Sequence, residues 1–66
     1  MTEREQLIQQ LTNAINKREG VELTTEQVNH YIGCDMPVSK LAVWTHDTES
    51  GNDPVTSDDV LSLWEE

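Results

Sequence analysis

The chain has 66 residues, a formal net charge of −9 and a hydrophobic fraction of 35%. A chain this short forms one domain with a thin core, and it has no run near the ~20 apolar residues that a membrane-spanning helix needs. Its single cysteine, Cys34, excludes an internal disulfide, and its excess of carboxylates disfavours phosphate-bearing ligands.

The expected compartment follows from the N-terminal residues and the lone thiol. The first ten residues, MTEREQLIQQ, are charged and polar, and they lack the apolar stretch of a secretory signal. A free cysteine is typical of proteins in a reducing compartment. We therefore expect a cytoplasmic protein.

The first predicted helix runs from about residue 2 to residue 18. Thr2 and Glu5 fit a capping box at its start. Gly20 follows the last turn, where a left-handed residue commonly ends a helix. One apolar side is predicted by hydrophobic residues four apart, namely Leu7, Leu11 and Ile15.

The second predicted helix lies within LTTEQVNHYIG, residues 23–33, and signals mark both of its ends. Thr24 can cap the start, and Gln27 completes a capping box. Gly33 comes where a left-handed C-terminal residue is expected. An apolar pair, Leu23 and Val28, fits a hydrophobic staple.

The segment after Pro37, VSKLAVWTH, is ambiguous between helix and strand. Proline is favoured in the first turn of a helix, and apolar residues recur at helical spacing, at Val38, Leu41 and Ala42. Valine, tryptophan and threonine favour a strand instead. We predict a helix, with a strand over residues 38–45 as the alternative.

Residues 47–54, DTESGNDP, have the composition of a loop. A final helix is expected after it, because Thr56 can cap the start and acidic residues follow in the first turn. Val55 and Val60 form a second staple, and Trp64 ends the apolar stretch. The expected fold is mainly α, a compact bundle of three to four short helices in a single domain, residues 1–66.

The charge is uneven along the sequence. Residues 1–34 hold five acidic and three basic residues, which leaves −2, whereas residues 35–66 hold eight and one, which leaves −7. Such a field favours basic partners. We expect the partner-binding carboxylates in this second half, at Asp47, Glu49, Asp53, Asp58 and Asp59.

Two tryptophans, Trp44 and Trp64, are the candidate aromatic anchors for a partner. Tryptophan is enriched at the residues that dominate interface energies. In a chain without phenylalanine the core also needs aromatic area, so we expect at least one indole to be mostly buried. If Trp64 is exposed, it is the better anchor.

A metal site or a catalytic thiol is not expected. His30 and Cys34 are four residues apart, with Asp35 and His46 as further possible ligands, but Gly33 interrupts the helical spacing between the first two. A thiol at the C-terminal end of a helix is disfavoured as a thiolate. We find no serine triad and no phosphate-binding glycine loop, and we predict a protein that is not an enzyme and uses no cofactor.

The order TTEQVNHYIG, CDMP, VSKLAVWTH resembles a helix-turn-helix, which implies a DNA-binding regulator. The second helix of that pair would carry one cation, Lys40, whereas phosphate contacts supply most of the affinity for DNA. The apolar positions after Gly33 are also shifted from the usual offsets. Direct nucleic-acid binding is therefore only a second alternative.

A second resemblance concerns residues between 28 and 50. With one gap allowed, their order is similar to part of the phage inhibitors of uracil-DNA glycosylase, at Val28, Ile32, Gly33, Pro37, Ser39, Leu41, Val43, Thr45, Glu49 and Ser50. The resemblance implies an acidic inhibitor that imitates nucleic acid. That family has a multistranded sheet that this chain is too short to complete, and no functional residue is carried over.

The function we favour is a non-catalytic, small acidic regulator or adaptor that acts through protein–protein contact as a homodimer. We expect an apolar seam from the first or the final helix, because the core of one copy is thin. The alternative is the nucleic-acid-mimicking inhibitor, whose affinity falls steeply as salt screens its exposed charges.

Overall fold

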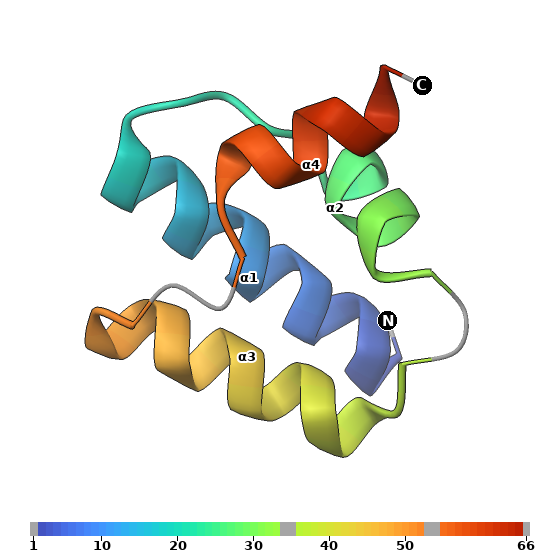
Figure 1. Ribbon diagram of the computed structural model, residues 1–66. Helices are drawn as coiled ribbons and strands as arrows, with labels where there is room; N and C mark the ends of the chain where they lie inside the picture. Colours follow the sequence, from blue (N-terminus) through green and yellow to red (C-terminus); the bar gives the residue numbers. More distant parts are fainter. Residues whose placement is uncertain (1, 34–35, 53–54, 66) are drawn as a thin grey trace.

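The computed structural model describes residues 2–33, 36–52 and 55–65, and within these ranges the chain forms four α-helices and no strand. They are α1 (Glu3–Glu19), α2 (Thr25–Ile32), α3 (Val38–Ser50) and α4 (Ser57–Trp64), shown in Figure 1. The mainly α bundle is confirmed. The alternative of a strand over residues 38–45 is wrong, because these residues lie within α3. None of these helices is both long and apolar enough to cross a membrane.

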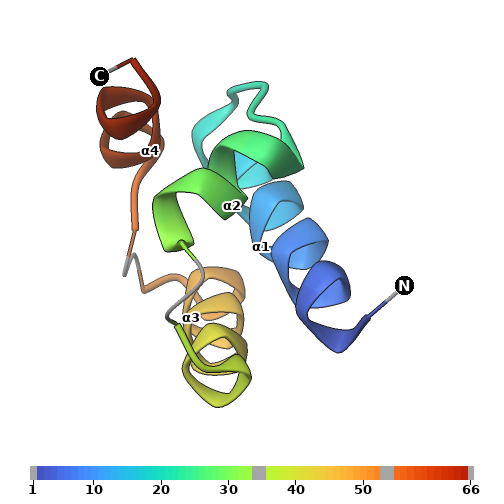
Figure 2. The same cartoon turned by 90° about the vertical axis from the view of Figure 1, so that its right-hand side faces the viewer.

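The helix α1 is the one that touches all the others. Along one side it packs against α3, and elsewhere it packs against α2 and α4, which also pack against each other (Figures 1 and 2). In the described ranges no Cα atom of α3 lies within 8 Å of one in α2 or α4. The helices α2 and α4 therefore pack as a pair, and α3 packs on α1 with Leu41 in the shared core.

The helix α1 has the predicted ends to within one residue. The Thr2 hydroxyl accepts a hydrogen bond from the backbone N–H of Glu5 at 3.2 Å, which satisfies a free donor of the first turn. At the other end Gly20 adopts a left-handed conformation, with φ 67° and ψ 36°, and its N–H donates to the carbonyl of Asn16.

The helix α2 has the full capping box that the sequence predicts. The Thr24 side chain accepts from the Gln27 N–H at 3.2 Å, and the Gln27 side chain accepts from the Thr24 N–H at 3.0 Å. Leu23 and Val28 are both buried, as the staple requires. Gly33 has the expected positive φ of 75°, but its ψ of −175° is extended, so the chain leaves the helix without a left-handed turn.

The helix α3 is longer than predicted, and the loop prediction is wrong for residues 47–50. The helix continues to Ser50 and ends at Gly51, whose φ is 104°. Thr48 explains the extension, because it is buried, at 3% exposure, and its hydroxyl donates to the carbonyl of Trp44 at 2.9 Å. A polar composition thus conceals a buried side of the helix.

The hydrophobic core is drawn unevenly from the helices. Nine hydrophobic residues are buried in the described ranges, namely Ile8, Leu11, Ile15, Leu23, Val28, Ile32, Leu41, Val55 and Val60. Three of them lie on α1, five on α2, α4 and the residues that precede these helices, and one, Leu41, on α3. The core is thus centred between α1 and the α2–α4 pair.

Two polar side chains of α1 fix the chain segments that lead into α2 and α4. Asn16 makes two bonds with the backbone of Leu23, accepting from its N–H at 2.8 Å and donating to its carbonyl at 3.1 Å. The Glu19 carboxylate accepts from the N–H of Ser57 at 2.8 Å and from its hydroxyl at 3.0 Å. With the predicted cap from Thr56 to the Asp59 N–H, these bonds set the start of α4.

Candidate protein-binding surface

Trp64 lies at the end of α4, where its apolar stripe runs past the core. It follows Val60 by four residues and Leu61 by three, which places all three on one side of the helix. Val60 is fully buried and Leu61 partly buried, but Trp64 stays 39% exposed. The condition that the sequence sets for Trp64 as an anchor, an exposed indole, is therefore met.

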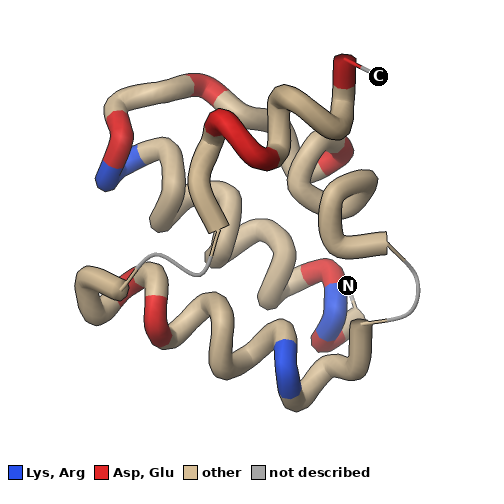
Figure 3. The backbone as a smooth tube through the Cα atoms, viewed as in Figure 1, with Lys and Arg blue, Asp and Glu red and all other residues tan. Residues whose placement is uncertain are grey.

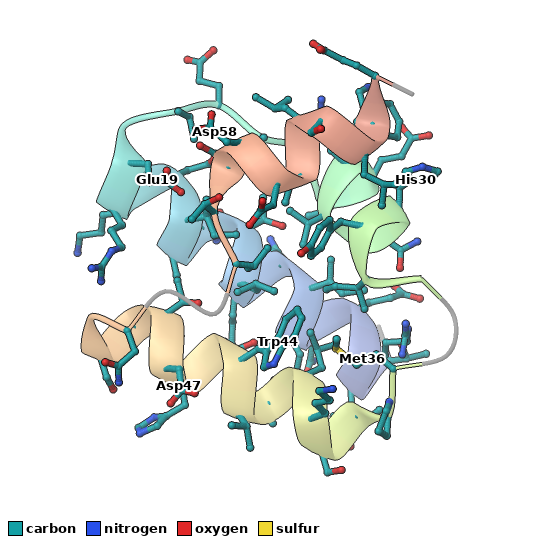
Figure 4. The ribbon with its side chains drawn as sticks, in the orientation of Figure 1. Glu19, His30, Met36, Trp44, Asp47 and Asp58 are labelled. Atoms are coloured by element: carbon teal, nitrogen blue, oxygen red, sulfur yellow. The ribbon has the colours of Figure 1, made fainter. Side chains whose placement is uncertain are left out.

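His30 contacts the Trp64 ring. The two ring centroids are 5.4 Å apart, and the planes meet at 87°, an edge-to-face contact between α2 and α4. Figure 4 shows His30 on the part of α2 that lies beside the end of α4. His30 is itself exposed, so the contact leaves both rings at the surface. The sequence indicates His30 only as a possible metal ligand, because no local pattern predicts a contact between residues so distant in the sequence.

Trp44 occupies a different environment. It is partly buried and packs against the core, and the Lys40 ammonium lies 5.8 Å from its ring centroid, within the range of a cation–π contact. Figure 4 shows it on the side of α3 that faces the rest of the molecule. Because it is partly buried against the core, Trp44 is less suited than the exposed Trp64 to anchor a partner.

Four of the five carboxylates expected to bind a partner are described, and they lie on two helices. Asp47 and Glu49 are on α3, whereas Asp58 and Asp59 are on the first turn of α4. In the described ranges no Cα atom of α3 lies within 8 Å of one in α4. Asp53 lies outside the described residues.

The charges are divided between the packed units of the fold. We define the α2–α4 face as residues 21–33 and 55–65. All of its Asp, Glu, Lys and Arg residues are acidic: Glu22, Glu26, Asp58, Asp59 and Glu65. The four basic residues of the chain, Arg4, Lys17, Arg18 and Lys40, all belong to α1 and α3 (Figure 3). The sequence could not show this division, because α2 joins α4 only in the folded molecule.

The described residues offer little to catalysis or metal binding. No three His, Cys, Asp or Glu side chains among them gather closely enough to hold a metal ion. Cys34 and Asp35 lie outside the described residues. Two surface hollows of about 630 and 710 Å³ border α1, and each is lined by charges of both signs, Lys17, Arg18 and Glu49 in the first and Arg4, Glu5 and Glu26 in the second. This mixture of charges favours neither an anion nor a cation.

The two resemblances seen in the sequence are not matched by the geometry of the described residues. The two helices of a helix-turn-helix are joined by a short turn and form one packed unit, but here no described Cα atom of α2 lies within 8 Å of one in α3. The residues from Ser39 to Ser50 that resemble the glycosylase inhibitors lie in α3, and no part of the described chain forms a strand.

Comparisons of the chain with models of protein families, with curated proteins and with solved structures found no match. The chemistry of the surface is therefore the basis for inferring function. The strongest feature of this surface is Trp64, exposed and in contact with His30, in a pair of helices whose described charged residues are all acidic.

Proposed function

We propose that the chain is a non-catalytic regulator or adaptor that acts through protein–protein contact, with Trp64 at the centre of the contact. The observation that carries the proposal is the exposed indole in edge-to-face contact with the His30 ring. A few buried residues supply most of the binding energy at protein interfaces, and tryptophan is prominent among them. The apolar stripe of α4 ends in Trp64, a tryptophan that the core of the chain leaves partly exposed.

The competing explanation is that Trp64 only stabilises α4. Val60, which is fully buried, and the partly buried Leu61 already fasten this helix to the core. A purely structural Trp64 affects folding, whereas a binding Trp64 affects the affinity for the partner in a chain that stays folded. The two explanations are separated by measuring stability and binding on the same variants.

The test uses Trp64→Ala, with Val43→Ala as the matched control. Val43 is the other exposed large hydrophobic residue of the described chain and lies on α3. We expect proteins captured from a lysate by the immobilised wild type to be retained by Val43→Ala and lost by Trp64→Ala. With a captured partner in hand, titration should show a loss of affinity of about thirtyfold, the effect of an interface residue worth about 2 kcal/mol.

A third variant, Trp64→Phe, controls for the possibility that Trp64→Ala loses binding because it unfolds. It keeps an aromatic ring in the contact with His30, so its circular dichroism spectrum should match that of the wild type and part of the affinity should return. Equal binding by wild type and Trp64→Ala, with both folded, would refute the proposal.

The nucleic-acid mimic stays the second candidate, supported by the absence of Lys and Arg from the described α2–α4 face. A mimic binds through its carboxylates, so its affinity falls steeply with salt and does not depend on Trp64. Capture of basic nucleic-acid enzymes that moderate salt releases equally from the wild type and Trp64→Ala would favour this candidate.

The homodimer also stays a prediction. The large hydrophobic residues that the described chain exposes are Val43 on α3 and Trp64 on α4, and none is on α1. Of the two expected seams, α4 is therefore the better supported. A symmetric contact there brings the carboxylates of two copies together, which opposes association at low salt.

A further inference from the structure

We infer that the partner segment that docks on Trp64 is basic, with Lys or Arg residues on both sides of an apolar residue. The inference rests on the proposed function and specifies the chemistry of its partner. Its basis is the division of charge in the fold, because the described α2–α4 face carries five carboxylates and no Lys or Arg. The charge that complements such a surface is positive.

The carboxylates of α4 lie at unequal angles from the stripe that ends in Trp64. Asp58 and Glu65 are seven residues apart, two helical turns, and so lie along one side of α4. Asp59 precedes Trp64 by five residues, which places it beyond the other side of the stripe, about 140° from the indole round the helix. A bound segment that covers the indole with an apolar residue therefore brings its neighbouring residues closest to Asp58 and Glu65.

The indole itself adds to the preference for a cation. The ring of tryptophan attracts Lys and Arg through its negative face. The chain already contains this arrangement in α3, where the Lys40 ammonium lies 5.8 Å from the centre of the Trp44 ring. The Trp64 ring on α4 makes an edge-to-face contact with the His30 ring of α2, with an angle of 87° between the two planes. The exposed part of the indole remains accessible to a second group.

Other occupants fit the described surface less well. A second copy of the chain would bring a face of the same sign, and a nucleic acid would bring phosphates against carboxylates. Neither supplies the positive charge that would complement Asp58 and Glu65 on α4. Both occupants become outcomes of the experiment.

The experiment titrates the full ¹⁵N-labelled chain with a synthetic amphipathic peptide of Lys and Leu, followed by amide and indole NMR shifts. The control peptide has Glu in place of every Lys. We expect shifts of the Trp64 indole N–H and of the α2 and α4 amides with the Lys peptide alone. No binding at low salt, equal shifts with the Glu peptide, or shifts confined to α3 would overturn the inference.

Two pairs of substitutions, each of which removes two negative charges, show which carboxylates contribute to peptide binding. Asp58→Asn with Glu65→Gln removes two charges from α4, and Asp47→Asn with Glu49→Gln removes two from α3, which in the described ranges has no Cα atom within 8 Å of one in α4. Because screening limits exposed charges to about 8 Å at physiological salt, we expect the α4 pair to weaken binding three- to tenfold and the α3 pair less than twofold. Equal weakening would mean attraction by net charge alone and would refute the inference.

The same titration separates this inference from the proposed function. If Trp64→Ala binds the Lys peptide as the wild type does while the α4 pair still weakens binding, the role of Trp64 fails and the charge preference stands. If Trp64→Ala loses binding but the two pairs act equally, the proposed function stands and the inference fails. Where circular dichroism shows that the α4 pair has unfolded, Glu22→Gln with Asp59→Asn replaces it.

Discussion

The two sides of α1 are packed by different chemistry. Toward α2 and α4, five buried aliphatic residues close the core, two of them valines that are at most 1% exposed in and before α4. Toward α3, Leu41 is the one buried aliphatic residue, and the other buried positions of this helix are the hydroxyl-bearing Thr45 and Thr48. The longer helix is thus held by the less apolar contact.

This difference predicts different stabilities for two parts of one small chain. The helices α2 and α4 have eight residues each, and helices of that length form in water only when they pack. Buried aliphatic residues fasten this pair to the core. The helix α3 has 13 residues but one buried aliphatic residue, so we expect it to open before the rest.

The largest expected effect is that of Leu41→Ala. Removing a fully buried leucine typically costs about 2–5 kcal/mol, against a total stability of about 3–10 kcal/mol for a chain of this length. Because Leu41 is the buried aliphatic contact of α3, the α3 amides should lose protection from hydrogen exchange while the α2 and α4 amides keep theirs. Simultaneous loss of protection in all four helices would show that α3 does not open separately from the rest. The control is Val60→Ala, in the part of the core between α1 and the α2–α4 pair, for which we expect loss of protection in all four helices.

The parts of the fold that the sequence predicts are those with local causes. The capping box of Thr24 and Gln27 and the cap at Thr56 are complete within a few residues, so they can be read directly. The extension of α3 to Ser50 cannot, because it depends on Thr48 being buried against a distant helix. Composition alone favours a loop at that position.

The candidate surface divides in the same way. Trp64 is found from the sequence because an indole in a capped helix is a recognisable anchor. Its contact with His30 and the charge division between α2–α4 and the rest of the described chain depend on which helices pack together. Net charge counted along the sequence therefore cannot show that the α2–α4 pair carries no Lys or Arg among its described residues.

The next largest effect is expected at Arg4, whose side chain links the α2–α4 pair to α3. The Arg4 guanidinium donates to the carbonyls of Gly33 and Met36, the latter at 2.7 Å, so it ties the end of α2 to the start of α3. We expect Arg4→Ala to lower the free energy of unfolding by about 1.5–3 kcal/mol, because two carbonyls lose a charged donor. Chemical denaturation measures this loss.

Arg4→Lys is the control for charge. It keeps the positive charge but lacks the planar fork that donates to two acceptors at once, so it should recover less than half of the lost stability. Full recovery by lysine would show that the contact acts through charge alone and does not join the two helix ends.

The smallest expected effect distinguishes the two sides by exchanging a methyl and a hydroxyl. The Thr48 hydroxyl bonds to a carbonyl of its own helix, an arrangement that adds little to stability, so Thr48→Val should change the unfolding free energy by less than about 0.5 kcal/mol. Val60→Thr makes the reverse exchange in the aliphatic side of the core, where a hydroxyl in place of a methyl group costs about 1–2 kcal/mol even when it bonds to a carbonyl of its own helix. Thermal unfolding of both variants tests the contrast. If Thr48→Val destabilises the chain as much as Val60→Thr does, the packing of α3 requires its buried hydroxyl groups. The contact between α1 and α3 would then depend on polar groups as strongly as the contact of α1 with α2 and α4 depends on aliphatic side chains.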